Sequence, residues 1–150
     1  MKAYQTTNVS VSKSQEAIRQ ILRKHKADGI NFGEEWIAQS PYIFCKFLYT
    51  IQGIQHLILF KVPLPFATKT TATGRKKVET QIEKEQSQIE RGIWRAVYWA
   101  IKSKLESAEF RIETFTEAFL SHFVIPGTEK QIGELIIPQL KAGTLKMIEV

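Results

Sequence analysis

Residues 41–65 read PYIFCKFLYTIQGIQHLILFKVPLP, and this stretch decides the fold class. Aromatic and β-branched residues dominate it, as they do in β-strands. The QG pair at its centre is a turn signal, so the stretch predicts a β-hairpin in which residues 42–50 pair with residues 54–62. The final prolines would end the second strand, because proline cannot donate a ladder hydrogen bond. Side chains of both parities are mostly apolar, which indicates that both faces are at least partly covered.

A helix is predicted before the hairpin. In SKSQEAIRQILRKHKA, residues 12–27, apolar side chains recur at the i, i+1, i+4, i+5 spacing of one buried helix face. Ser12 and Gln15 have capping-box spacing at its start. Asp28-Gly29 would end it, with glycine in the left-handed conformation. The preceding TTNVSVS is expected to form a short strand or an extended arm, and INFGEEWIA is expected to form a further strand.

A longer helix is predicted after the hairpin. FATKTTATGRKK, residues 66–77, is rich in threonine and contains a glycine, so it predicts a flexible basic loop. Residues 78–108 follow with helical periodicity. Thr114 and Glu117 have capping-box spacing for a shorter helix over residues 115–124. QIGELIIPQL is expected to form a further short turn or helix, and the tail LKMIEV a strand or a disordered end.

This order of elements predicts an α+β fold. A small antiparallel sheet, made of the hairpin and one or two further strands, would pack against the N-terminal helix and the long amphipathic helix. The chain has 150 residues, of which 43% are hydrophobic and 24% charged. These values suit one globular domain over residues 1–150. The lone cysteine, Cys45, excludes an internal disulfide and is expected to be a small buried apolar residue.

The formal net charge is +6 and is unevenly distributed. It is +4 over residues 1–65, +5 over residues 66–104 and −3 over residues 105–150. Such asymmetry favours an anionic ligand or head-to-tail self-association into a homo-oligomer. The N-terminus has no apolar h-region, and no apolar run approaches the ~20 residues of a membrane span. A cytoplasmic protein with no membrane partner is therefore expected.

The long helix carries a basic stripe. At ~100° per residue, four side chains fall within about 40° of Lys84. They are Arg91, Arg95, Tyr98 and Lys102. Opposite them lies an apolar set that predicts the buried face. It consists of Ile82, Ile89, Ile93, Ala96, Val97 and Ala100. Trp94 and Trp99 would lie on the two flanks between these faces, each with its ring buried and its N–H within reach of water.

Three interpretations of this stripe are open. It is a solvated face with snorkelling cations, a surface on which cations contact phosphates while aromatic rings stack on bases, or an oligomer interface. The basic loop adds cations beside the N-terminus of the helix, where backbone N–H groups favour anions. The candidate nucleic-acid-binding residues are Arg75, Lys76, Lys77, Lys84, Arg91, Arg95, Tyr98, Trp99 and Lys102.

Signals of catalysis are sparse. Metal-dependent phosphoryl chemistry uses clustered carboxylates, whereas this chain has one aspartate and scattered glutamates. The acidic pair in GEEW, residues 33–36, is expected to be solvated in a turn. His25, His56 and His122 lie far apart without cysteine partners, so no zinc site is predicted. His122 is expected to be a packed side chain and not a catalytic base. We predict no catalytic residue, metal or cofactor, and a phosphodiester-processing enzyme is the least supported alternative.

Several motifs in the second half of the chain form a recognisable set. They are LP (64–65), TGRKK (73–77), WRA (94–96), IKSKLE (101–106), FTEAFLSHFVIPG (115–127) and GE (133–134). They resemble a family of small, mostly uncharacterised proteins encoded by bacteriophages and by prophage-like regions of bacterial genomes. The first half resembles this family more loosely, through VSVSKSQEAIRQILRKHKADG and PLP.

The resemblance implies a context of phage replication and recombination, and it implies no catalytic residues. The leading hypothesis is a non-enzymatic nucleic-acid-binding or accessory protein, with single-stranded DNA as a candidate partner. The alternative is a structural protein that self-associates or docks on a replication partner.

Overall fold

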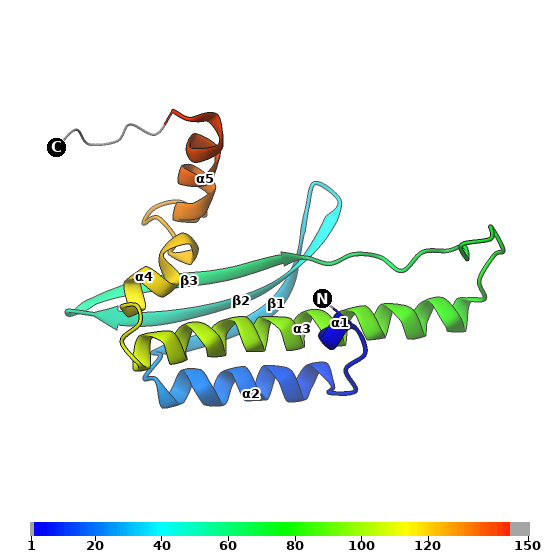
Figure 1. Cartoon of the computed structure of the whole chain (residues 1–150), viewed down its shortest axis with the longest axis horizontal. Helices are drawn as coiled ribbons and strands as arrows, with labels where there is room; N and C mark the ends of the chain where they lie inside the picture. Colours follow the sequence, from blue (N-terminus) through cyan, green and yellow to red (C-terminus); the bar gives the residue numbers. More distant parts are fainter. Residues whose placement is uncertain (1, 145–150) are drawn as a thin grey trace.

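A computed structural model describes residues 2–144 of the chain. The fold is α+β, as predicted from the sequence, with a three-stranded antiparallel sheet lying against helices (Figure 1). The elements are α1 (Lys2–Gln5), α2 (Val11–Lys24), β1 (Gly29–Ile37), β2 (Ser40–Ile51), β3 (Ile54–Pro63), α3 (Glu79–Glu109), α4 (Phe115–Phe119), the 3-10 turn η1 (Leu120–His122) and α5 (Ile132–Ala142). Among the described residues, no helix is both long enough and apolar enough to span a bilayer.

The sheet is a meander of two tight hairpins in the order β1-β2-β3. The predicted hairpin is confirmed: β2 pairs with β3 from Tyr42↔Pro63 to Ile51↔Ile54. Its turn residues, Gln52 and Gly53, have φ values of 50° and 80°, and this pair of positive angles matches the twist of the flanking strands. The GEEW segment is part of β1, so the prediction of a turn there was wrong. The chain reverses instead at Ala38 and Gln39, which both have positive φ.

The ends of α2 differ from the prediction. Ser10, not Ser12, is the N-cap, and its hydroxyl accepts a hydrogen bond from the Lys13 N–H at 3.2 Å. TTNVSVS forms no strand. Residues 7–10 belong to no regular element, with Ser10 extended, and α2 begins at Val11. At the other end, Lys26 takes the left-handed conformation, with φ of 66°. Gly29 does not, because it is already paired with Leu48 in the sheet.

The buried face of α3 also differs from the prediction. Its buried residues are Gly92, Trp94, Val97, Ile101 and Leu105. Of the predicted apolar set, only Val97 is fully buried. Trp94 is not a flank residue but a core residue, 3% exposed, with its ring 5.5 Å from Phe32 in an edge-to-face arrangement. The cause is tertiary: α3 packs on α2 and, at Gly92, on α1, where an added Cβ would lie 2.8 Å from the Tyr4 carbonyl oxygen.

The core lies between one face of the sheet and the helices α2, α3 and α4. Its largest fully buried side chains are Phe47, Phe119, Ile18, Leu22, Ile43, Ile58 and Ile101. Cys45 belongs to the same core and is buried, as predicted. Along β2 the core face alternates with side chains that are only half-buried, such as Phe44 and Lys46. The second face of the sheet is therefore covered only in part.

The C-terminal region begins with the predicted capping box, in which Thr114 and Glu117 exchange side-chain and backbone hydrogen bonds. The helical segment ends at His122, since Phe123 and Val124 are extended and join the edge of β3. Helix α5 then projects away from the layer formed by α2 and α3 (Figure 1). The tail LKMIEV lies outside the described residues.

Candidate nucleic-acid interface

The predicted basic stripe lies on the surface of α3. Lys84 and Trp99 are exposed, and Arg91, Arg95, Tyr98 and Lys102 are half-buried. None of them is a buried member of the core, although Tyr98 packs against it. With a rise of 1.5 Å per residue, the stripe extends about 27 Å along the helix from Lys84 to Lys102. The helical periodicity misplaced the buried face of α3, but the side chains that it grouped into the basic stripe are all exposed or half-buried.

Four of these residues form one compact group, which we call the aromatic–cation cluster: Arg95, Tyr98, Trp99 and Lys102. The Tyr98 and Trp99 rings are 5.3 Å apart in an edge-to-face arrangement. The Arg95 guanidinium carbon lies 4.3 Å from the centre of the Tyr98 ring, and Lys102 Nζ lies 4.7 Å from the centre of the Trp99 ring. The cluster thus joins two cations to two aromatic rings on one helix surface.

The cations of the cluster are only weakly neutralised. Lys102 Nζ lies 3.8 Å from a Glu106 carboxylate oxygen, and such a partly exposed i,i+4 pair contributes ~0.3–0.5 kcal/mol at most. Arg95 forms no ion pair with another residue in the described range 2–144. An anionic ligand would therefore meet two cations whose charge is still available, beside a Trp99 side chain that is 39% exposed.

The remaining predicted binding residues lie outside the aromatic–cation cluster, and two of them are held by contacts within the protein. The Lys77 ammonium, 10% exposed, donates to Glu85 at 2.7 Å and to Thr68 at 2.8 Å, so its charge is used within the protein. Arg91 donates to the Gln88 side chain at 2.6 Å. That side chain in turn donates to the Gln5 and Thr7 carbonyls and holds the N-terminal segment against α3.

The loop cations lie apart from the cluster. Arg75 and Lys76 are exposed in a small turn, where the Thr71 N–H donates to the Arg75 carbonyl at 2.8 Å. This turn precedes the N-terminus of α3, and the helix rise puts Tyr98 about 28 Å from Glu79. The predicted site therefore divides into the cluster on α3 and a pair of loop cations near the opposite end of the helix.

A second surface with cations and aromatic rings was not predicted from the sequence. On the half-buried face of the sheet, Lys46 Nζ lies 4.6 Å from the Phe44 ring centre and Lys61 Nζ lies 5.5 Å from the Tyr42 ring centre. Phe44 rests on Gly33, where a Cβ would lie 2.5 Å from the ring. Side chains alternate between the two faces along a strand, and this alternation places these residues on one face. The alternating pattern was therefore the sequence signal that could have revealed this surface.

The histidines and acidic residues form no evident catalytic arrangement. His122 stacks on Phe60 with ring centres 4.0 Å apart. Its burial, and secondarily the Lys104 charge, lower the pKa of His122. Within residues 2–144, no group of three or more histidine, cysteine, aspartate or glutamate side chains could hold a metal ion.

No protein-family model, curated protein or solved structure matches the chain. The resemblance to phage-encoded proteins stays a prediction.

Proposed function

We propose that this protein is a non-enzymatic nucleic-acid-binding or accessory protein of phage-type DNA replication or recombination, and that it binds single-stranded DNA with the basic surface of α3. The observation that carries this proposal is the aromatic–cation cluster. Arginine and lysine contact phosphates, and aromatic rings stack on unpaired bases with little sequence preference. The motif resemblance is the reason for naming DNA rather than RNA.

Within the cluster, each side chain has a role in this proposal. Arg95 and Lys102 bind successive phosphates, and both move off the rings when they do so. Trp99, the more exposed ring, then accepts a base, with Tyr98 supporting it edge-on. Lys84 and Arg91 extend the phosphate contacts toward the N-terminus of the helix.

Binding to a labelled oligothymidine should weaken about fifty-fold between 50 and 200 mM salt. The estimate assumes four phosphate contacts, by Lys84, Arg91, Arg95 and Lys102, each releasing ~0.7 counterion from a single strand. Fluorescence anisotropy across a salt series measures the slope. An affinity that does not change with salt would contradict the proposal.

The double variant Arg95→Ala/Lys102→Ala should reduce that salt slope by about 1.4, since two of the four contacts are lost. The matched control is Lys130→Ala/Lys141→Ala, which removes the same charge from exposed positions near and within α5. If both double variants lose the same affinity, the interaction is a nonspecific effect of net charge and not of the α3 surface.

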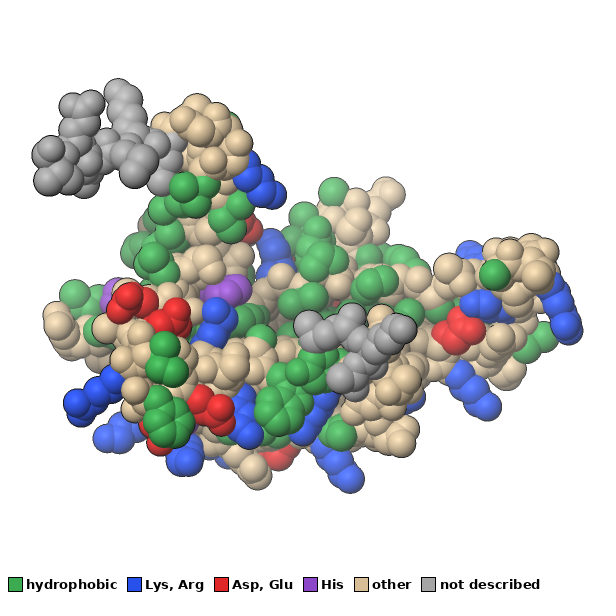
Figure 2. All heavy atoms as spheres, in the orientation of Figure 1, with side chains coloured by type: hydrophobic (Ala, Val, Ile, Leu, Met, Phe, Trp, Pro, Cys, Tyr) green, Lys and Arg blue, Asp and Glu red, His purple; other side chains and the backbone are tan. Residues whose placement is uncertain are grey.

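A second candidate function is supported by α5. Leu135, Ile137 and Leu140 on this helix are exposed, and Figure 2 shows hydrophobic side chains on its surface. By helix geometry, Ile137 and Leu140 lie about 60° apart on one side of α5, and Leu135 lies on another side. Exposed apolar side chains that share one side of a helix are typical of interaction sites. Under this alternative, the protein self-associates or docks on a replication partner through α5.

Ile137→Glu/Leu140→Glu should weaken self-association at least about tenfold, because two apolar contacts of ~1–2 kcal/mol each are replaced by charges. Sedimentation equilibrium over a concentration series measures this. Phe110→Glu, at an exposed position outside α5, serves as the control. A wild-type chain that is monomeric at every concentration would exclude self-association and leave only a heterologous partner.

A further inference from the structure

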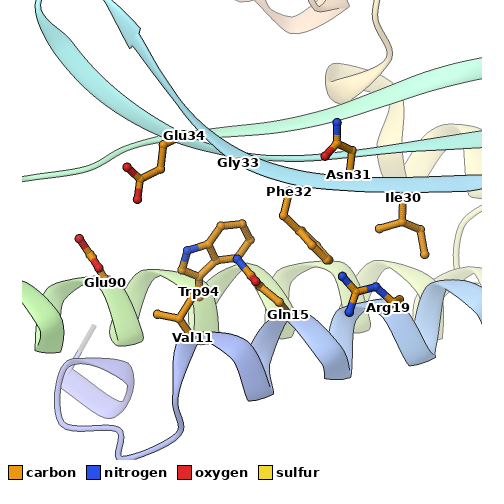
Figure 3. Close-up of a pocket in the computed structure, with 10 residues that line it drawn as sticks. All are labelled: Val11, Gln15, Arg19, Ile30, Asn31, Phe32, Gly33, Glu34, Glu90 and Trp94. Carbon is orange, nitrogen blue, oxygen red and sulfur yellow. The ribbon is translucent and has the colours of Figure 1, made fainter.

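A pocket of about 400 Å³ lies between α2, β1 and α3 (Figure 3), and none of its lining residues belongs to the aromatic–cation cluster. Polar side chains enter it from all three elements. Its lining includes Gln15, Arg19, Phe32, Glu34, Glu90 and Trp94. None of them was singled out for nucleic-acid binding.

Two carboxylates form one end of this pocket. Glu34 projects from β1 and Glu90 from α3, and they lie opposite one another (Figure 3). Burial, and secondarily the Glu34 charge, raise the pKa of Glu90. Neither carboxylate forms an ion pair with any residue of the described range 2–144. A cation between them would therefore be stabilised by both charges.

The Trp94 indole supplies a second, independent feature. Its side chain is 3% exposed, and the ring nitrogen lies on the side that faces the two glutamates (Figure 3). Within residues 2–144 this N–H donates no hydrogen bond to the protein. It is open to solvent at the pocket, because Ser14 Oγ is the one buried polar side-chain atom left without a partner in that range. The pocket thus presents an N–H donor without a protein partner beside two carboxylates without ion pairs, whereas Arg19 at the other end pairs with Glu16 at 2.6 Å. A ligand that fits the carboxylate end must carry both an acceptor and a cation.

A second hollow shares the same two glutamates. It is lined by Trp36, Pro41, Leu64 and Phe66 together with Glu34 and Glu90. Trp36 and Phe66 are exposed, and their ring centres are 6.0 Å apart. These side chains offer an apolar surface directly beside the carboxylates, which suits an apolar substituent on the same ligand.

A bare metal ion fits this site poorly. Divalent cations take six or more oxygen ligands or a closed set of side chains, whereas no three metal-binding side chains come together among the described residues. An ammonium group has three donors and is satisfied by two carboxylates.

We propose that this pocket binds a primary ammonium that has a carbonyl oxygen beside it and an apolar side chain, the chemistry of an amino-acid amide or of the N-terminal residue of a peptide. The ammonium lies between Glu34 and Glu90, and the carbonyl oxygen accepts from Trp94. The apolar side chain packs on Trp36 and Phe66. This site does not depend on nucleic-acid binding, and its test uses no nucleic acid.

The test is a titration of the full chain with phenylalaninamide, followed through the indole N–H signals in ¹H–¹⁵N correlation spectra. The Trp94 signal should shift and saturate. Trp36→Phe and Trp99→Phe, both at exposed positions, assign the three tryptophan signals without disturbing the core. N-acetylphenylalaninamide, which lacks the positive charge, is the matched control and should cause no saturating shift.

Glu34→Gln and Glu90→Gln should each weaken phenylalaninamide binding about tenfold or more, because each removes a charge-assisted hydrogen bond. Glu129→Gln, at an exposed position elsewhere, should bind like the wild type. A third probe, the tripeptide amide Phe-Gly-Gly, separates the two sources of the ligand. If it binds as well as phenylalaninamide, the site accepts a peptide N-terminus, and if only phenylalaninamide binds, the ligand is a small molecule. No saturating Trp94 shift, equal binding of the acetylated probe, or unchanged binding by both glutamine variants would overturn the proposal.

Discussion

Replacing Phe119 by alanine should lower the free energy of unfolding by about 3–5 kcal/mol. Phe119 is fully buried and is the residue through which α4 enters the core. Its ring centre lies 5.8 Å from that of Phe47, 6.0 Å from that of Phe60 and 4.6 Å from that of Phe115. The first two rings belong to β2 and β3, so one substitution removes two of the ring contacts that attach α4 to the sheet, and the stacking of Phe115 on Tyr49 remains. Urea unfolding followed by circular dichroism measures the loss.

Phe110→Ala is the matched control, since the Phe110 side chain is 75% exposed. The same chemical change there should alter stability by less than about 0.5 kcal/mol. A loss below about 1 kcal/mol for Phe119→Ala would mean that the core closes over the vacated space or that α4 contributes little to it. A loss of the size expected would show that α4 stabilises the sheet, not only the C-terminal region.

The parts of the fold that the sequence predicted correctly are those with strong local signals. The hairpin follows from an apolar run split by Gln52-Gly53, and the turn needs two positive φ angles that glycine and its neighbour adopt there. The long helix follows from sustained periodicity over about eight turns. The Thr114–Glu117 capping box is equally local, since its hydrogen bonds join residues three apart.

The predictions that failed required knowledge of neighbours. Ser10 and Ser12 both fit an N-cap, and the choice depends on where α2 begins to pack. Helical periodicity showed an apolar face on α3, but it could not show that the face carrying Trp94, Val97 and Ile101 meets the sheet and α2. The other apolar face, with Ile89, Ile93 and Ala96, lines a groove beside α1 instead.

The two candidate sites also differ in whether local sequence spacing could reveal them. The aromatic–cation cluster lies within two turns of one helix, so its members could be grouped from their spacing alone. The pocket at Trp94 brings Glu34 of β1 to Glu90 of α3 across 55 intervening residues. Its carboxylates looked unremarkable in the sequence, because only the tertiary fold brings β1 and α3 to the same pocket.

At pH 8, the Cys45 thiol should react with iodoacetamide about a thousandfold more slowly in the folded protein than in the chain unfolded by urea. The thiolate is the reactive species, and burial raises the pKa of Cys45 from its ordinary value of 9.0 to about 12. At pH 8, well below both values, three pKa units reduce the thiolate fraction about a thousandfold. Mass spectrometry of timed, quenched samples measures both rates. Ser103→Cys in a Cys45→Ala background is the control, and this exposed thiol should react at similar rates in both states.

The reaction of Cys45 should also report on how the core opens. Cys45 pairs with Phe60 in the sheet, and Phe60 contacts Phe119. If the thiol reacts only after global unfolding, Phe119→Ala should accelerate its labelling by at least about a hundredfold, the factor that 3 kcal/mol supplies. If the folded protein labels within about tenfold of the unfolded chain, the hairpin opens locally and the β2–β3 face is not the stable centre of the fold. If Cys45 is labelled slowly in the wild type and no faster in Phe119→Ala, the hairpin keeps Cys45 buried without α4.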